Sequence, residues 1–214
     1  MTFLALILMF SPVSGFAQAM TEKLHRAAGA NDTAAIRTLL SQGADLEARD
    51  GRGRTALLVA THASRIDAAA ALIEAGADVN AKDAIDDSPY LYAGARGFTE
   101  ILKLTLTHGA DLKSTNRYGG TALIPAAERG HVEVVELLIA AGVDVDHVNK
   151  LGWTALLEAI ILADGGPRHV EIVKQLLAAG ANPRLADGDG VTPLQYARQR
   201  GYGAMAELLQ EAGG

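Results

Sequence analysis

Apolar and polar residues follow a repeating order along most of the chain: two short apolar runs at helical spacing, then a polar turn. In one copy the apolar positions are Leu123, Ala126 and Ala127 in the first run and Val134, Val135, Leu137 and Leu138 in the second. Spacings of three and four residues place such positions on one face of a helix. Because Gly130 separates the two runs, each copy is predicted to form two amphipathic helices joined by a tight turn.

A related six-residue string marks the start of each copy. It reads TALLVA at Thr55, SPYLYA at Ser88, TALIPA at Thr121, TALLEA at Thr154 and TPLQYA at Thr192. The first three steps are 33 residues long and the last is 38. Residues 24–28 and 39–47 form a sixth copy ahead of these five. A fixed period of this length indicates a stacked repeat architecture.

The period and these words resemble the ankyrin repeat over residues 20–214. The resemblance implies an all-α ankyrin-repeat solenoid of about six helix-turn-helix units with β-hairpin-like fingers. The units are expected near residues 20–49, 50–82, 83–115, 116–148, 149–186 and 187–214. Since no unit can bury its own apolar face, the units must stack on one another.

Local signals agree with these helices. Thr or Ser at the head of five copies can accept hydrogen bonds from the free N–H groups of the first helix, whereas the N-terminal copy has Glu22 there. Glycine follows the second helix of five copies, where a left-handed backbone is expected. These glycines are Gly43, Gly76, Gly109, Gly142 and Gly180.

Some copies depart from the pattern. The 38-residue step adds five residues to the fifth copy, and we expect a lengthened first helix and a protruding loop at residues 160–168. This loop could recognise a partner or be a tolerated insertion. Pro125 lies inside a predicted helix and should disturb it. Asp86 replaces a finger glycine and Tyr90 replaces a leucine, which predicts a distorted finger in the third unit. The helix histidine of the family occurs only as His25.

The N-terminal segment has the order of a secretory signal peptide. Residues 3–10 are continuously apolar, a Ser-Pro pair follows, and small residues at 17–19 suit cleavage. The apolar run is too short to span a membrane, and no Lys or Arg precedes it. We expect a signal peptide at residues 1–19, cleaved after Ala19, and a periplasmic or secreted protein with no membrane contact once the signal is removed. The alternative is a cytoplasmic protein whose N-terminal helix docks on the first unit.

Composition and motifs argue against several activities. A net charge of -6 argues against general nucleic-acid binding, and the absence of cysteine excludes disulfides and thiolate sites. The chain contains no phosphate-binding loop, nucleophile elbow or His-Glu-x-x-His motif. The string DGDG at 187–190 lacks the further ligands of a calcium loop. We therefore expect a non-enzymatic protein with neither a metal nor another cofactor.

The six histidines are dispersed without the spacing of metal ligands: His25, His62, His108, His131, His147 and His169. His131 and His169 occupy equivalent positions at the starts of second helices, which favours a structural role in the repeat.

The resemblance also implies that a partner binds a concave face formed by finger tips and the ends of first helices. In this register the predicted partner-binding residues are Arg52, Arg54, Ile85, Arg96, Arg117, Tyr118, Arg129, Lys150, Leu151 and Trp153. Basic residues at 52, 54, 96, 117, 129, 150 and 200 outnumber acidic residues at 87, 128 and 189 on this face. A locally positive face predicts a protein partner with an acidic surface.

Trp153 is the only tryptophan and lies one finger along from Tyr118. Aromatic residues are enriched in binding hot spots, so Trp153 is a candidate anchor; alternatively it packs on a neighbouring finger and stiffens the array. The sequence thus favours a monomeric, exported protein-interaction module. A cytoplasmic structural adaptor stays open, as does a small-molecule or anion-binding protein, or a hydrolase, using the basic groove near residues 160–168.

Overall fold

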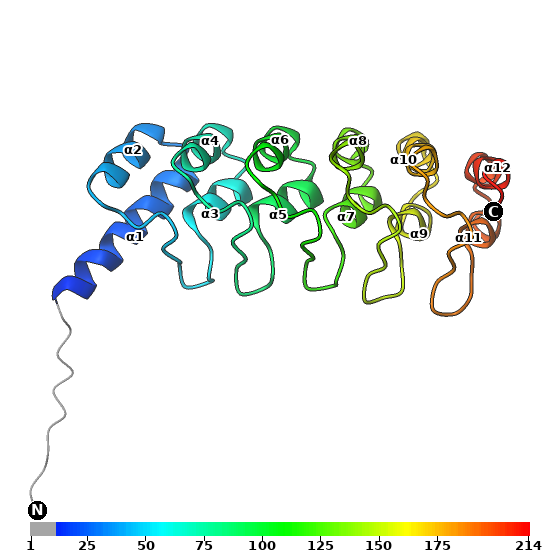
Figure 1. Ribbon diagram of the computed structural model, residues 1–214, viewed down its shortest axis with the longest axis horizontal. Helices are drawn as coiled ribbons and strands as arrows, with labels where there is room; N and C mark the ends of the chain where they lie inside the picture. Colours follow the sequence, from blue (N-terminus) through cyan, green and yellow to red (C-terminus); the bar gives the residue numbers. More distant parts are fainter. Residues whose placement is uncertain (1–11) are drawn as a thin grey trace, which may run out of the picture. The chain divides into compact units, whose positions relative to one another are not determined.

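The computed structural model describes residues 12–214, which contain twelve helices and no strand (Figure 1). These residues form two compact units, one ending at Ala77 and the other covering Asp78–Gly214. Each unit consists of helix pairs followed by finger loops, so the predicted all-α repeat fold is confirmed. None of the described helices is both long enough and apolar enough to cross a membrane.

The first unit contains four helices: α1 (Pro12–Ala30), α2 (Thr33–Ser41), α3 (Ala56–His62) and α4 (Ile66–Glu74). Helix α1 packs against α2 and α3, and α4 packs against the same two helices. Apolar residues at helical spacing form its core and are fully buried, namely Leu24, Ile36, Leu57, Leu58 and Leu72.

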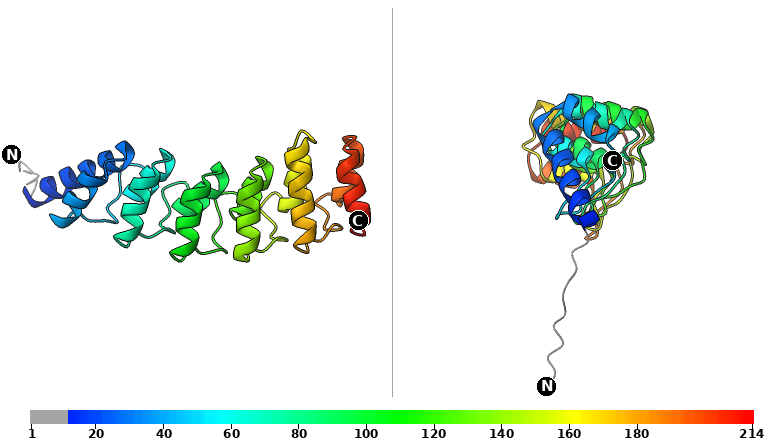
Figure 2. Two further views of the ribbon diagram at one scale, coloured as in Figure 1. Left: turned by 90° about the horizontal axis from the view of Figure 1, so that it is seen from above. Right: turned by 90° about the vertical axis from the view of Figure 1, so that its left-hand side faces the viewer.

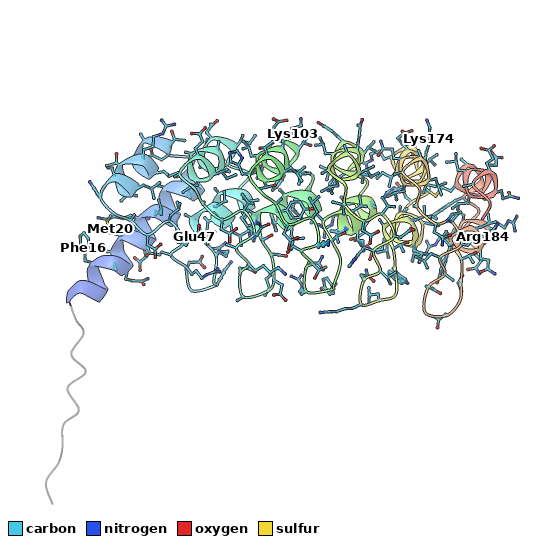
Figure 3. The ribbon with its side chains drawn as sticks, viewed as in Figure 1. Phe16, Met20, Glu47, Lys103, Lys174 and Arg184 are labelled. Carbon is cyan, nitrogen blue, oxygen red and sulfur yellow. The ribbon has the colours of Figure 1, made fainter. Side chains whose placement is uncertain are left out.

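Helix α1 is longer than the repeat copy it opens. It spans 19 residues and continues through Glu22, so that position is not a helix start. The predicted cleavage position after Ala19 lies within α1, next to the buried side chain of Met20; Figure 3 shows Phe16 and Met20 on this helix. The apolar run at residues 3–10 lies outside the described residues, so the signal peptide stays a prediction.

The second unit contains four helix pairs. They are α5 (Pro89–Arg96) with α6 (Thr99–Thr107), α7 (Leu123–Glu128) with α8 (Val132–Ala141), α9 (Ala155–Ile161) with α10 (Pro167–Ala178), and α11 (Pro193–Gln199) with α12 (Gly203–Glu211). The first helices α5, α7, α9 and α11 pack in series, and the second helices form another row beside them (Figure 2). Fingers of this unit extend to one side of the first helices (Figure 1).

The row of second helices carries solvated charges on the side away from the fingers. Lys103 Nζ lies 3.0 Å from Glu100 Oε1 and 3.3 Å from Glu133 Oε1, and all three side chains are exposed. Lys174 lies on α10 in the same row (Figure 3). Because exposed ion pairs contribute about 1 kcal/mol or less, this side of the unit is an ordinary solvated surface.

Four of the five predicted helix caps are present. The side chains of Thr55, Ser88, Thr154 and Thr192 each accept a hydrogen bond from the N–H three residues on. Thr121 is the exception, since its buried Oγ1 has no hydrogen-bond partner. Helix α7 begins only at Leu123 and has six residues, with Pro125 inside it. The disturbance expected from Pro125 is therefore confirmed, and it removes the cap expected at Thr121.

The five predicted turn glycines all have left-handed backbones, with φ between 82° and 96°. The finger that carries Asp86 keeps the geometry of its neighbours. Asp86 takes a φ of 63°, and its N–H donates a hydrogen bond to Asp83 O. In the next finger the N–H of Gly119 donates the equivalent hydrogen bond to Asn116 O. The expected distortion is wrong, because an aspartate can adopt the left-handed conformation at a cost of about 1 kcal/mol.

The five added residues of the fifth copy do not lengthen its first helix. Helix α9 has seven residues, as α11 has, whereas α10 has twelve, two more than α8. The expectation of a long first helix is wrong: the added residues extend the start of α10, where Pro167 is favourable, and form the loop at 162–166. The Tyr202 hydroxyl donates a 2.7 Å hydrogen bond to Ala163 O, which fastens this loop to the last helix pair.

Candidate functional site

Each finger tip is organised by an Asp or Asn at its base. Asn149 Oδ1 accepts hydrogen bonds from the N–H groups of Leu151 (2.9 Å) and Trp153 (3.0 Å). The equivalent residues make the same two bonds, namely Asp50, Asp83, Asn116 and Asp187. Side chains of this kind stabilise tight turns by binding backbone N–H groups ahead of them. The residue two positions on is therefore held at the tip of each finger.

Three consecutive tips of the second unit carry exposed apolar side chains. Ile85, Tyr118 and Leu151, which we call the tip ridge, are 50%, 54% and 56% exposed. Single exposed apolar residues are ordinary on protein surfaces. Three at one repeated position on consecutive fingers form a candidate contact surface.

A pocket of about 310 Å³ adjoins the tip ridge. Its walls come from α5, α7 and α9 and from the fingers that precede them. The pocket brings together five of the predicted partner-binding residues: Arg96, Arg117, Tyr118, Arg129 and Leu151. Residues that are distant in sequence therefore share one surface, as the repeat register predicts.

The other predicted residues of the second unit lie outside the pocket lining. Ile85 belongs to the tip ridge, and Lys150 Nζ donates a 2.9 Å hydrogen bond to Arg117 O, which links two adjacent fingers. Trp153 is half-buried and does not line the pocket. Its role as an anchor remains a prediction.

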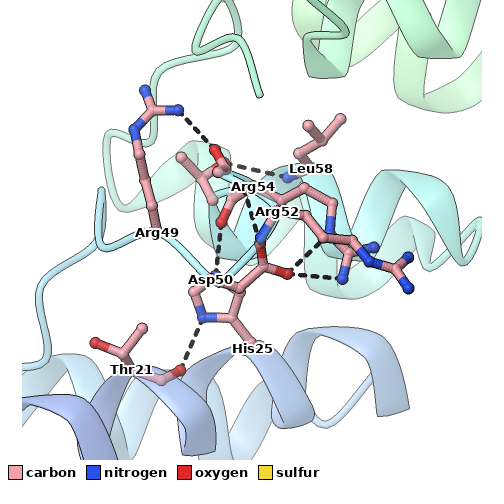
Figure 4. A network of polar contacts seen from close by, with 9 residues as sticks. Thr21, His25, Arg49, Asp50, Arg52, Arg54 and Leu58 are labelled. Carbon is pink, nitrogen blue, oxygen red and sulfur yellow. Dashed lines mark hydrogen bonds and ion pairs between the residues drawn. The ribbon is translucent and has the colours of Figure 1, made fainter. Parts of the chain in front are cut away.

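Arg52 and Arg54 belong to the first unit, where they surround Asp50 (Figure 4). Arg54 Nη2 lies 2.7 Å from Asp50 Oδ2. Burial raises the pKa of Asp50, but hydrogen bonds from Arg54 and Arg52 outweigh it and bring the pKa to about 2. His25 Nε2 lies 2.9 Å from Arg54 O, and His25 Nδ1 lies 2.8 Å from Thr21 O. The charge of Arg54 is thus balanced within its own unit.

Three carboxyl groups accompany the three arginines of the pocket. Asp87, Glu128 and Glu158 line it together with Arg96, Arg117 and Arg129. Their formal charges cancel, in contrast to the positive excess counted along the sequence. The lining leaves out Arg52, Arg54, Lys150 and Arg200, and it includes Glu158, which lies within the first helix α9 rather than at a finger tip or a helix end.

Glu158 is the site residue that sequence reasoning missed. It is only 5% exposed, and its Oε1 accepts a 2.8 Å hydrogen bond from Asn149 Nδ2. Burial, helped by the negative charge of Glu128, raises the pKa of Glu158 from 4.5 to about 7. Burial also raises the pKa of Asp87, with Asp83 adding to the effect. Two of the three carboxyl groups of the pocket are therefore easier to protonate than usual.

Among the described residues, no pocket arginine forms an ion pair with a carboxylate. The Arg117 guanidinium lies 4.9 Å from the centre of the Tyr118 ring, and that of Arg96 lies 6.0 Å from the centre of the Tyr92 ring. Arg129 Nη1 donates a 2.6 Å hydrogen bond to Ala95 O. Since each guanidinium has five N–H donors, most donors of the three arginines are available to a ligand.

The histidines of the second unit serve the packing of consecutive helix pairs. His169 Nε2 lies 2.9 Å from Glu128 O in the preceding pair. Burial lowers the pKa of His131, which lies against Gly97 of the preceding pair. These contacts agree with the structural role predicted for both residues. In the part of the chain with described side chains, no group of three His, Asp or Glu residues is placed to hold a metal ion.

The paired helices, repeated fingers and left-handed glycine turns define a repeat protein of the ankyrin class. The family profile described as ankyrin repeats (3 copies) matches residues 15–83 and 90–187. The chain belongs to the ankyrin repeat family. Domains of this kind are generally non-catalytic and typically act as protein-interaction modules.

Solved structures and a curated relative agree with this assignment. An ankyrin repeat domain from Acinetobacter baumannii AYE is 67% identical, with a TM-score of 0.87 over 89% of this chain and 97% of that chain. The ankyrin repeat domain of Bcl-3, a member of the IkappaB protein family, is 26% identical, with a TM-score of 0.80 over 90% of this chain and 86% of that chain. The putative ankyrin repeat protein YahD of Escherichia coli (strain K12) is 53% identical over 57 residues. That match spans 27% of this chain and 28% of the relative.

Proposed function

We propose that this protein binds a partner protein through the finger side of its second unit and performs no catalysis itself. The observation that carries the proposal is the tip ridge, because three consecutive fingers present exposed apolar side chains at the same position. Tyr118 and Leu151 also line the pocket that holds the three arginines. Aromatic and arginine side chains are the most frequent hot-spot residues of protein interfaces.

The order of binding follows from this arrangement. Arginines without an internal ion pair attract acidic groups on an approaching protein and raise the association rate. The tip ridge then buries its apolar area against the partner. Because the fingers are fixed by backbone hydrogen bonds to Asp and Asn side chains, the surface is preformed and little conformational freedom is lost on binding.

Affinity capture with a tip-ridge variant tests the proposal. The full chain carrying Ile85→Ser, Tyr118→Ser and Leu151→Ser is compared with wild type as bait for envelope and cytoplasmic extracts of the source organism. The control bait carries Ile66→Ser, a change at an exposed apolar residue on α4. The proposal expects one protein to be captured by wild type and control and lost with the tip-ridge variant. Equal capture by all three baits contradicts it.

We further propose export of the protein, with cleavage after Ala19 and function as a monomer. The support is the apolar run at residues 3–10 followed by a Ser-Pro pair and small residues. The intact mass of protein purified from the source organism decides the point. A chain that begins at Met20 supports export, whereas retention of residues 1–19 supports a cytoplasmic adaptor in which α1 is complete.

A further inference from the structure

The pocket beside the tip ridge holds three arginines that are not paired directly with a carboxylate among the described residues. Arg96, Arg117 and Arg129 come from α5, from the finger before α7 and from the end of α7. None of them lies within ion-pair distance of a carboxylate in the described chain. Guanidinium groups bind carboxylates with paired N–H donors, so these three arginines are suited to an acidic group from outside.

The protonation state of Glu158 sets the net charge of the pocket. Helix α9 packs against α7, α10 and α11. The charges that act on the Glu158 carboxyl are Glu128 within α7 and Arg129 at its end, and they oppose one another. Asp87, Arg96 and Arg117 line the same pocket at its other walls. A neutral Glu158 therefore leaves three arginines facing two carboxyl groups, whereas an ionised Glu158 cancels the excess.

We infer that the pocket receives a single acidic side chain of the partner, bound by the three arginines and by a hydrogen bond from the protonated carboxyl group of Glu158. This inference rests on the proposed function and adds the chemistry that the partner must present. One proton is shared between the two carboxyl groups, as in other close carboxyl pairs. If Glu158 is ionised before binding, it takes up one proton from solvent as the partner docks.

Two features favour an acidic side chain over other anions. A doubly charged phosphate would face the carboxyl groups of Asp87 and Glu128 in the same pocket. A free small acid would leave the exposed side chains of Tyr118 and Leu151 uncovered beside it. An acidic residue flanked by apolar residues satisfies both the arginines and the tip ridge.

Two peptides of defined sequence provide the probe. They are acetyl-Ala-Leu-Glu-Leu-Ala-amide and its counterpart with Gln in place of Glu. Binding to the full chain is followed by NMR, from the chemical shifts of the Arg Nε–H and Asn149 Nδ2 signals. Glu158 is mostly protonated at pH 6 and about one-tenth protonated at pH 8. The dissociation constant of the Glu peptide should therefore be about tenfold higher at pH 8 than at pH 6. The Gln peptide should bind more weakly than the Glu peptide at pH 6.

The variants separate this inference from general charge effects. Glu158→Gln keeps a hydrogen-bond donor at every pH, so it should bind the Glu peptide equally at pH 6 and pH 8. Glu136→Gln, an exposed change on α8, should keep the pH dependence of wild type. Arg96→Gln should weaken binding at both pH values, since Arg96 has no other ion pair in the described chain.

Three results would overturn the inference. They are equal affinity for the Glu and Gln peptides, a pH dependence of Glu-peptide affinity that persists in Glu158→Gln, and a failure of both peptides to bind. Equal affinity for free N-acetylglutamate amide and for the Glu peptide would overturn the choice of a protein side chain in favour of a small acid. The proposed function stands or falls separately, because the tip-ridge capture experiment does not depend on these peptides.

Discussion

Asn149 Nδ2 donates a 2.8 Å hydrogen bond to Glu158 Oε1, nine residues further along the chain. The same two positions of the next copy hold Asp187 and Tyr196, and there the Tyr196 hydroxyl donates a 2.6 Å hydrogen bond to Asp187 Oδ2. The donor lies on the finger in one copy and on the helix in the other. Each pair joins the base of a finger to its first helix, and in these two copies the residue types at the two positions are complementary.

Replacing Asn149 with Asp should destabilise the protein in a pH-dependent way. The new carboxylate still accepts the two N–H bonds of the finger tip, but it cannot donate to Glu158. At pH 8 two carboxylates then face each other, and we expect a loss of about 2–4 kcal/mol in unfolding free energy. At pH 5 a shared proton should remove most of this loss.

Urea unfolding at both pH values measures the effect of Asn149→Asp. The matched control is Asn116→Asp, which has the same tip bonds but has Pro125, rather than an acid, nine residues on. This control should stay close to wild type. Equal destabilisation by the two changes would show that the finger alone, and not the pair with Glu158, is responsible.

Glu158→Gln should stabilise the folded protein at high pH. The pKa of Glu158 is raised from 4.5 to about 7 in the fold. Its protonated carboxyl group therefore contributes fully to the stability of the fold below pH 4.5, and this contribution is lost as the pH rises through 7. The amide that replaces the carboxyl group cannot ionise and can still accept the bond from Asn149. We expect the unfolding free energy of the variant to be about 2–3 kcal/mol higher than that of wild type at pH 8 and equal to it near pH 4.5. Denaturation at a series of pH values measures the difference, and a constant difference across the range would contradict the assignment.

The two threonines at equivalent helix starts should respond differently to replacement by valine. Thr154 caps α9, so Thr154→Val should lower the unfolding free energy by about 1 kcal/mol. Thr121 Oγ1 is buried without a partner, so Thr121→Val should be neutral or slightly stabilising. Thermal unfolding of both variants gives the comparison, and an equal loss would mean that Thr121 does cap α7.

Adjacent leucines on α8 test the register of the core. The sequence pattern places Leu137 and Leu138 on one buried face, but Leu138 is fully buried and Leu137 only half-buried. Leu138→Ala should cost about 2–5 kcal/mol, and Leu137→Ala clearly less, because its side chain already contacts solvent. The order of the two melting temperatures is the observation to make; a reversed order would contradict the placement of α8.

The sequence predicts most of the fold because the repeat is governed by local rules. Glycine turns, threonine caps and the break caused by Pro125 depend on residues within a few positions of one another. The placement of the five added residues was not predicted, since periodicity cannot tell which of two adjacent helices absorbs an insertion. Only the packing of the loop beneath Tyr202, from a later copy, distinguishes the two.

The candidate site was predicted in part. Finger-tip residues and the ends of the first helices follow from the register, and so Tyr118, Leu151 and the pocket arginines were predicted. Glu158 was missed because a lone glutamate in a short helix usually faces solvent. A signal was available, since the equivalent positions of the other copies hold Val59, Tyr92, Pro125 and Tyr196, which marks the position as one that faces other side chains.

Hydrogen exchange of the full chain, alone and with its captured partner, tests the central claim most directly. If the finger side of the second unit is the binding surface, backbone N–H groups in residues 83–87, 116–120 and 149–153 should be protected by the partner. Exchange in α6, α8 and α10 should change little. Protection confined to those second helices, with the finger tips unchanged, would contradict the account.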